Sequence, residues 1–254
     1  MSVDPAAPIL QMRAVRKTFA GFVAVRDLNL DVRRGTIHAL IGPNGAGKTT
    51  VFNLATKFHQ PTSGKITFKG LDITSTAPSQ VARLGMVRSF QISAVFASMT
   101  ALENVRVALQ RFRKDDFAFW KSERVLHVLD DRARELLNEV GLDELRDRKA
   151  GELPYGRRRA LELATTLALD PELLLLDEPM AGMGHEDVER TAALIRRVAD
   201  HRTVLMVEHN LSVVAHLSDY ITVLARGEVL AEGTYEQVSR DPAVIEAYVG
   251  TDHD

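Results

Sequence analysis

A glycine-rich stretch constrains this chain more than any other feature, and it reads Gly42-Pro43-Asn44-Gly45-Ala46-Gly47-Lys48-Thr49. It matches the phosphate-binding loop pattern G-x-x-x-x-G-K-[ST] at every defined position. The glycines let the backbone curl, so that consecutive N–H groups point into one concavity at the start of a helix, where the helix dipole also favours an anion. Residues 36–41 are predicted to form a buried strand before the loop, and residues 50–55 a helix after it. The stretch therefore predicts a nucleoside triphosphate site and leaves the reaction open.

Two side chains of the loop add chemistry to its backbone. Lys48 supplies a positive charge for the outer phosphates. Thr49 supplies a hydroxyl ligand for Mg²⁺, a hard cation that prefers oxygen. The loop thus predicts a nucleotide bound together with a metal ion.

The bulk composition limits the class of protein. A chain of 254 residues suits one large domain, or a core with a smaller lobe, and 45% hydrophobic residues support a sizeable core. The formal net charge of −2 argues against a dedicated nucleic-acid binder, and the lack of cysteine excludes disulfides and thiolate metal sites. We recognise no secretory signal in residues 1–8 and no apolar run near the ~20 residues of a membrane-spanning helix. We expect a soluble protein that associates with a membrane only through a partner.

The first part of the chain is predicted to be rich in strands. Strands are expected over residues 9–15, 23–32, 65–69 and 86–90, with a short helix near 81–84. The apolar alternation within residues 23–32 is imperfect, which suggests a bulge or a half-buried sheet.

The middle of the chain is predicted to be helical. Thr100-Ala101-Leu102-Glu103 forms a capping box that opens a helix through about Gln110. Apolar residues from 126 to 140 recur at helical spacing, and Gly141 ends that helix. Residues 92–163 are therefore predicted to be a helical insert.

The last part returns to alternating strands and helices. Strands are predicted over residues 172–177 and 203–208, helices over 160–169, 185–200 and 210–217, and a hairpin over 220–225 and 228–231. Strands that alternate with helices indicate a mainly parallel sheet covered on both faces.

Polar residues follow three of the predicted strands. Asp177 and Glu178 end the strand 172–177, Gln91 follows 86–90, and His209 follows 203–208. Ligand sites of open α/β sheets lie at the carboxyl ends of strands, where Asp177 could hold the Mg²⁺ water shell and Glu178 polarise an attacking water. Taken singly, each residue also has an alternative without function: Asp177 and Glu178 as solvated acids, Gln91 as an ordinary loop glutamine, and His209 as a structural histidine.

A basic segment, Leu153-Pro154-Tyr155-Gly156-Arg157-Arg158-Arg159, precedes the helix 160–169. Three arginines in a first helical turn oppose the helix dipole, which often marks a place where an anion approaches. A solvated basic turn, balanced by Glu152 and Glu162, is the alternative.

From about Ile9 to Gly250, these motifs in this order resemble the ATP-binding-cassette family. The resemblance implies an α/β fold of the P-loop NTPase (RecA-like) type, with a mainly parallel sheet core, an N-terminal antiparallel β subdomain and an inserted α-helical subdomain. It implies a single ATP-binding domain over 1–254, in which 1–91 and 164–254 form the core and 92–163 the helical subdomain. In this family ATP and Mg²⁺ are the cofactors, and ATP hydrolysis is the reaction.

The resemblance also assigns roles to individual residues. The implied ATP-binding residues are Phe19, which stacks on adenine, then Gly42, Pro43, Asn44, Gly45, Ala46, Gly47, Lys48, Thr49 and Thr50, and Gly156 supplied in trans by a second subunit. The implied metal ligands are Thr49, Gln91 and Asp177, and the implied catalytic residues are Glu178, His209 and Gln91.

Two segments depart from the family pattern. In the signature Leu153–Arg157, Pro154 and Tyr155 replace the usual serine and glycine, and Arg157 replaces glutamine. A serine contact to the γ-phosphate is therefore absent, while Gly156 and the helix amides remain. Residues 180–184, the D-loop, lack the usual aspartate, which leaves open how two subunits communicate.

Further motifs resemble the ATPase subunits of bacterial branched-chain amino acid importers: Leu153–Arg158, the D-loop Ala181-Gly182-Met183, Arg88–Gln91, and the ending Val244–Gly250. ATPases of urea, amide or aromatic-acid importers and of lipopolysaccharide export are the alternatives. The implied partners are transmembrane permease subunits, a second ATPase subunit (identical or related) and, indirectly, a periplasmic solute-binding protein, with no nucleic acid. The implied location is cytoplasmic, on the inner face of the plasma membrane through the permease subunits.

By the same analogy, residues 92–99 would form a groove for a permease helix. Residues 111–124 mix aromatic and basic side chains and suit either a partner surface or inward packing. Three other classes of protein are alternatives. A non-transport cassette ATPase usually has two cassettes or a long coiled-coil insert, and a GTPase would carry an Asn-Lys-x-Asp motif, which is not present. The others are a small-molecule kinase and a nucleotide-binding regulator without turnover.

Overall fold

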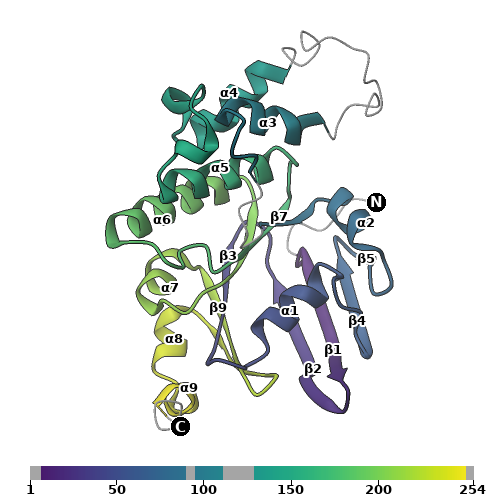
Figure 1. Ribbon diagram of the computed structural model, residues 1–254. Helices are drawn as coiled ribbons and strands as arrows, with labels where there is room; N and C mark the ends of the chain where they lie inside the picture. The colour runs from purple at the N-terminus through teal and green to yellow at the C-terminus, as the bar shows by residue number, and fades with distance from the viewer. Residues whose placement is uncertain (1–6, 90–94, 111–128, 250–254) are drawn as a thin grey trace. The chain divides into compact units, whose positions relative to one another are not determined.

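The computed structural model describes residues 7–89, 95–110 and 129–249 (Figure 1). The backbone forms two compact units. Residues 1–88, 172–179 and 199–254 make the first, called here the sheet unit, and residues 89–171 and 180–198 make the second, the helical unit. The helical insert predicted over residues 92–163 lies within the second unit, which also takes in residues 180–198.

The centre of the sheet unit is a six-stranded sheet of order β10-β9-β3-β8-β7-β6. Its strands are β3 (Ile37–Ile41), β6 (Met86–Arg88), β7 (Leu173–Asp177), β8 (Thr203–Val207), β9 (Tyr220–Ala225) and β10 (Glu228–Gly233). Only the pair β9–β10 is antiparallel, so the predicted hairpin and the mainly parallel sheet are confirmed. Every residue of β3, β7 and β8 is buried, as expected for parallel strands that are covered on both faces.

A second, antiparallel sheet has the order β2-β1-β4-β5. It consists of β1 (Leu10–Phe19), β2 (Phe22–Val32), β4 (Ser63–Phe68) and β5 (Leu71–Asp72). The register between β1 and β2 shifts three times, once between Met12 and Val15, which confirms the predicted irregularity and explains the imperfect alternation of apolar residues.

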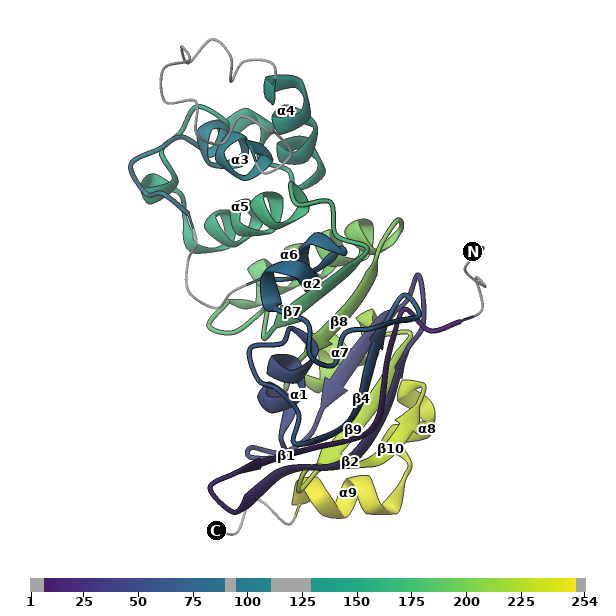
Figure 2. The same ribbon diagram turned by 90° about the vertical axis from the view of Figure 1, so that its right-hand side faces the viewer.

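The core of the sheet unit surrounds helix α1 (Lys48–Ala55). Phe52 of α1 is fully buried and belongs to a cluster that includes Phe68 of the antiparallel sheet and Leu205 of the parallel sheet. Figures 1 and 2 show α1 alongside both sheets. The helix that follows the phosphate loop is thus held by apolar packing from both sheets.

The remaining helices of the sheet unit are short. They are α2 (Pro78–Arg83), α7 (Leu211–Leu217), α8 (Tyr235–Ser239) and α9 (Pro242–Val249). Asn210 caps α7, because its Oδ1 accepts hydrogen bonds from the backbone N–H groups of Ser212 (3.1 Å) and Val213 (3.3 Å). The strand predicted over 86–90 is present as β6, which ends at Arg88; Ser89 lies outside it, and Phe90 is outside the described residues.

The helical unit holds α3 (Ala101–Leu109), α4 (Asp130–Glu139), α5 (Tyr155–Leu167) and α6 (His185–Ala199). Short 3₁₀ turns at Asp143–Leu145 and Ala150–Glu152 connect α4 to α5. The predicted capping box of α3 is confirmed, since Thr100 Oγ1 accepts from Glu103 N (3.2 Å) and Glu103 Oε2 accepts from Thr100 N (2.6 Å).

The predicted start of the helix 160–169 is wrong, because α5 begins at Tyr155. The arginines of its first turn are accommodated by separate acceptors. Arg157 donates to the carbonyl of Gly141 (3.0 Å) and Arg159 to the carboxylate of Glu162 (2.8 Å). Their charges therefore do not prevent the helix from starting early.

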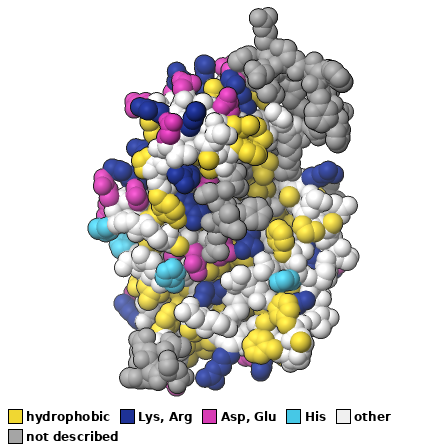
Figure 3. Space-filling view, in the orientation of Figure 1, with side chains coloured by type: hydrophobic (Ala, Val, Ile, Leu, Met, Phe, Trp, Pro, Cys, Tyr) yellow, Lys and Arg dark blue, Asp and Glu magenta, His cyan; other side chains and the backbone are white. Residues whose placement is uncertain are grey.

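Figure 3 shows Lys and Arg side chains interspersed with Asp and Glu side chains over the helical unit, in line with a net charge of −2. Within the described ranges, no helix has both the length and the apolar character needed to cross a membrane.

His38 is a buried polar residue in the middle of β3, with 0% of its surface exposed. Its Nε2 lies 2.8 Å from Thr222 Oγ1, and that hydroxyl donates to Glu232 Oε1 at 2.8 Å. Because the Thr222 proton is directed to Glu232, Nε2 carries a proton and donates it to Thr222. Burial, aided by the charge of Arg33, lowers the pKa of His38 to about 4.

We expect His38 to make the fold sensitive to mild acid. The pKa of His38 in the folded chain lies below its unfolded value near 6.5, so the unfolded chain binds more protons between about pH 6.5 and 4. Stability is therefore lost as the pH falls through this window, by roughly 2 kcal/mol between pH 7 and pH 5. Urea unfolding at both pH values should show this loss in the parent and in a control, His201→Gln, at an exposed site. The loss should be smaller in His38→Gln, and equal losses in all three proteins would contradict a neutral buried His38.

Candidate functional site

The phosphate loop connects the end of β3 to the start of α1, as the sequence predicts. Two of its glycines are required by close backbone approach. A Cβ on Gly42 would lie 2.1 Å from the carbonyl oxygen of Leu224, and one on Gly47 would lie 2.8 Å from that of Ala24. Gly47 is also the N-cap of α1, at a φ of 101°. The loop can therefore follow this path only with glycine at these positions.

Lys48 folds back over the loop that carries it. Its Nζ donates to the carbonyls of Gly42 (2.7 Å) and Pro43 (2.9 Å). Burial lowers the pKa of Lys48, while the nearby charges of Glu178 and Asp177 raise it. The ammonium group is thus held at the loop, where the predicted phosphates would bind.

Asp177, the last residue of β7, forms a buried ion pair with Arg88 at the end of β6. The two side chains are 3% and 13% exposed, and Arg88 also donates to Asn53 Oδ1 at 2.7 Å. Arg88 therefore links the end of β7 to α1, the helix that follows the phosphate loop. Sequence reasoning assigned Asp177 to Mg²⁺ but missed Arg88. The feature that could have identified Arg88 is its position at the end of an apolar strand, three residues before Gln91.

Glu178 and His209 lie at the ends of the neighbouring strands β7 and β8. Glu178 has a φ of 46°, which is uncommon for a residue with a side chain, and its N–H donates to Val207 O at 3.0 Å. His209 Nδ1 lies 4.0 Å from Glu178 Oε1, and the side chains are 62% and 34% exposed. The geometry thus places a carboxylate and an imidazole next to each other with access to solvent.

Glu208 holds the turn that carries His209. It is only 1% exposed, and its Oε2 accepts hydrogen bonds from the N–H groups of His209 (3.1 Å) and Asn210 (3.3 Å). The sequence analysis assigned no role to Glu208.

A cavity of about 420 Å³ lies over the phosphate loop within the sheet unit. It is lined by Phe19, Phe22, Ala24, Asn44, Gly45, Ala46, Gly47, Lys48, Thr49, Thr50 and Glu178. Phe19 is 38% exposed and its ring is in edge contact with His59, with centroids 5.2 Å apart. Phe22, which the sequence analysis missed, is 70% exposed.

The residues of this cavity fit a nucleotide with its metal ion. Backbone amides, an ammonium group and an exposed aromatic ring suit the phosphates and a base. The Thr49 hydroxyl in the lining, and the Asp177 carboxylate just before Glu178 in the chain, offer the oxygen donors that Mg²⁺ prefers. Of the other predicted residues, Gln91 lies outside the described residues, as do 92–94 and 111–124, and Gly156 belongs to the helical unit.

The sequence of this chain matches known protein families. The profile of the family described as "ABC transporter" matches residues 25–181. The chain belongs to the ABC transporter family. This confirms the family and the P-loop fold predicted from the sequence. The C-terminal residues 228–254 of this cassette match a second profile, "Branched-chain amino acid ATP-binding cassette transporter".

Individual relatives of this cassette cover nearly its whole length. The high-affinity branched-chain amino acid transport ATP-binding protein BraF of Pseudomonas aeruginosa is 42% identical over 253 residues, which is 96% of this chain and 98% of BraF. LivG of Escherichia coli K12, with the same description, is 38% identical, over 96% of this chain and 98% of LivG. The crystal structure of the ADP conformation of MJ1267, an ATP-binding cassette of an ABC transporter, superimposes with a TM-score of 0.84 at 29% identity, over 96% of this cassette and 100% of MJ1267.

We expect the ion pair between Arg88 and Asp177 to contribute strongly to stability. Arg88→Ala leaves a buried carboxylate unpaired, so the free energy of unfolding should fall by about 3 kcal/mol. Urea unfolding measures this loss, and Arg83→Ala, at an exposed site on α2, should change stability by less than about 0.5 kcal/mol.

A double-mutant cycle separates the pair from other effects of the substitution. Because Asp177→Asn removes the charge that Arg88 compensates, the double variant should be more stable than the sum of the two single losses predicts. Strictly additive losses would mean that the two side chains do not interact.

Proposed function

We propose that this cassette is the ATP-hydrolysing subunit of a bacterial importer of branched-chain or related amino acids. The observation that carries the proposal is the single cavity that joins the phosphate loop, Phe19 and Glu178, with His209 beside Glu178. The class of solute follows from the C-terminal profile and from the printed names of BraF and LivG.

The chain's own residues suggest how ATP would be held. The loop amides and Lys48 would bind the phosphates, and the exposed ring of Phe19 would stack on the base. Thr49, Asp177 and, by resemblance, Gln91 would hold Mg²⁺. Once bound, the ion supplies positive charge that neutralises the phosphate oxygens during transfer. Arg88 pairs with Asp177 and holds its carboxylate at the edge of the sheet.

Glu178 is proposed to orient and polarise the attacking water. Its unusual backbone conformation turns it out of the strand direction, and part of its side chain reaches solvent at the cavity. His209, held by Glu208 through its backbone, would fix the Glu178 carboxylate and contact the transferred phosphoryl group. General-base assistance of this kind is worth roughly 10²–10⁴-fold in rate, or about 3–5 kcal/mol.

Two subunits are proposed to complete each ATP site. Gly156 and the first amides of α5 would cover the phosphates bound by the loop of the other subunit, which is either a second copy or a related ATPase. Transmembrane permease subunits would anchor the pair to the inner face of the plasma membrane, and a periplasmic solute-binding protein would act through them. This arrangement is supported by the family and by the start of α5, where the N-cap residue makes no side-chain cap hydrogen bond.

Isolation of the intact complex tests the proposal as a whole. The chain is purified with an affinity tag from its native membrane, and co-purifying proteins and solute are identified by mass spectrometry. We expect permease subunits and an ATPase activity that a branched-chain amino acid with its binding protein stimulates. Co-purification with ribosomes or DNA-repair factors, or stimulation only by urea, an amide or an aromatic acid, would overturn the assigned solute or the transport role.

Glu178→Gln should abolish turnover but keep ATP binding. The substitution keeps the shape of the side chain and removes its basicity, so kcat should fall by about 10²–10⁴-fold with the Kd for ATP within two-fold. Lys48→Ala should instead weaken ATP binding itself, because it removes the charge at the phosphate loop. The ATPase rate and a fluorescent-nucleotide titration separate the two effects, with Glu236→Gln on exposed α8 as the control. Turnover in Glu178→Gln at the parental rate would refute the role of Glu178.

A further inference from the structure

The altered signature makes a contact within its own chain. Tyr155, the first residue of α5, donates a hydrogen bond from its hydroxyl to the carbonyl oxygen of Ala181 at 3.1 Å. Ala181 lies in the D-loop, residues 180–184, and both residues belong to the helical unit. A Cβ built on Gly182 would also lie 4.0 Å from the Tyr155 hydroxyl. The tyrosine that replaces the usual glycine therefore touches the loop that lacks the usual aspartate.

Arg159 supports the Tyr155 hydroxyl from one helical turn further along α5. Its Nε donates to the hydroxyl at 3.3 Å, and its guanidinium carbon lies 5.5 Å from the centre of the tyrosine ring. The other end of Arg159 donates to Glu162, which is only 6% exposed. Because the hydroxyl accepts from Arg159, its single proton is directed to the carbonyl of Ala181. A chain of hydrogen bonds thus runs from the buried side of α5 to the D-loop.

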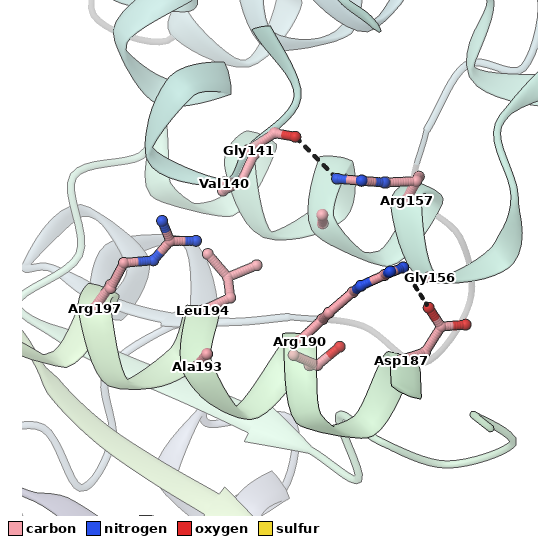
Figure 4. Close-up of a pocket in the computed structure, with 11 residues that line it drawn as sticks. Val140, Gly141, Gly156, Arg157, Asp187, Arg190, Ala193, Leu194 and Arg197 are labelled. Carbon is pink, nitrogen blue, oxygen red and sulfur yellow. Dashed lines mark hydrogen bonds and ion pairs between the residues drawn. The ribbon is translucent and has the colours of Figure 1, made fainter. Parts of the chain in front are cut away.

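A second contact joins the start of α5 to the start of α6. A Cβ on Gly156 would lie 2.7 Å from Asp187 Oδ1, so the carboxylate packs directly against the Gly156 backbone. Helix α5 has no acidic residue in its first turn, and Asp187 brings negative charge to the positive end of its dipole. Figure 4 shows Asp187 and Gly156 at one end of a cavity, with Arg190 beside Asp187. The cavity has a volume of about 220 Å³, and Arg190 Nη1 lies 3.9 Å from Asp187 Oδ1.

These two contacts bracket the loop that follows the proposed catalytic glutamate. Only Pro179 and Met180 separate Glu178 from Ala181 along the chain, and Met180 is buried. Residues 181–187 therefore contact the start of α5 at both ends, through the hydrogen bond from Tyr155 to Ala181 and through the close approach of Asp187 to Gly156. A shift of α5 would therefore act on this segment, which follows Glu178 after Pro179 and Met180.

We propose that Tyr155 is a positioning residue that couples the start of the signature helix α5 to the loop that follows Glu178. When a second subunit's nucleotide contacts Gly156, the hydrogen bond from Tyr155 to Ala181 transmits that contact to Glu178 of the same chain. This inference rests on the proposed function. Under this proposal the Tyr155 hydroxyl serves the communication between subunits, in a chain whose D-loop lacks the usual aspartate.

Tyr155→Phe tests this coupling, because it removes one hydroxyl and keeps the ring against Arg159. Tyr155 is 45% exposed, so the variant should fold with parental stability in urea. Hydrogen–deuterium exchange of the purified full chain without nucleotide should show amides in residues 181–187 exchanging about five-fold faster, as the loss of one hydrogen bond implies. Tyr235→Phe, an exposed tyrosine of α8, is the matched control and should leave this segment unchanged.

The functional readout uses the complex purified with its membrane subunits. In Tyr155→Phe, kcat for ATP should fall about five-fold, while the KM and the Kd for ATP stay within two-fold, because the substitution leaves the backbone amides of α5 and the residues that line the nucleotide cavity unchanged. Arg159→Gln keeps the Tyr155 hydroxyl without its support and should give a smaller change in the same direction.

The possible outcomes separate the two proposals. Unchanged exchange in residues 181–187 would overturn the contact itself. Faster exchange with a parental kcat would overturn the coupling and leave Tyr155 a structural residue. If the parental complex hydrolyses no ATP, the proposed function fails, while the exchange experiment still decides whether Tyr155 holds the D-loop.

Discussion

The parallel register of β3, β8, β7 and β6 is the constraint on which the rest of the site depends. Because these strands are neighbours and run in the same direction, their carboxyl ends meet at one edge of the sheet. The phosphate loop leaves β3 at this edge, and His209, Asp177 and Arg88 stand at the ends of the other three strands. Residues that are more than a hundred positions apart in the chain are therefore brought together by backbone pairing, before any side chain interacts.

Hydrogen bonds and ion pairs then fix the positions of the side chains at this edge. A carboxylate as deeply buried as Asp177 requires a partner, and Arg88 provides it while also binding Asn53 of α1. Lys48 is held on the carbonyls of its own loop, and Glu208 holds the backbone that carries His209. The two groups with access to solvent, Glu178 and His209, thus stand beside buried groups that fix the surrounding backbone and side chains. The surroundings of the site are therefore fixed by buried contacts, while two of its side chains stay accessible to solvent.

In the helical unit, hydrogen bonds and charges from neighbouring segments stabilise the start of α5. Helix α5 starts with three arginines and without a side-chain cap, which is unfavourable for an isolated helix. The structure compensates this with Asp187 from α6, the carbonyl of Gly141 and the carboxylate of Glu162. The departures of this cassette from the family pattern therefore belong together: a tyrosine in the signature and a D-loop without an acid are joined by one hydrogen bond.

The sequence by itself determined the phosphate loop, the alternation of strands and helices, the capping box of α3 and the positions of Asp177, Glu178 and His209 at strand ends. These features depend on local backbone preferences and on spacing along the chain, so they can be recognised without a structure. Only the tertiary structure decided that Arg88 pairs with Asp177, that Glu208 serves the backbone of His209, and that Tyr155 reaches Ala181. Each of these contacts joins segments whose proximity depends on packing, and residue type alone does not show which of many charged or polar groups becomes buried beside which partner.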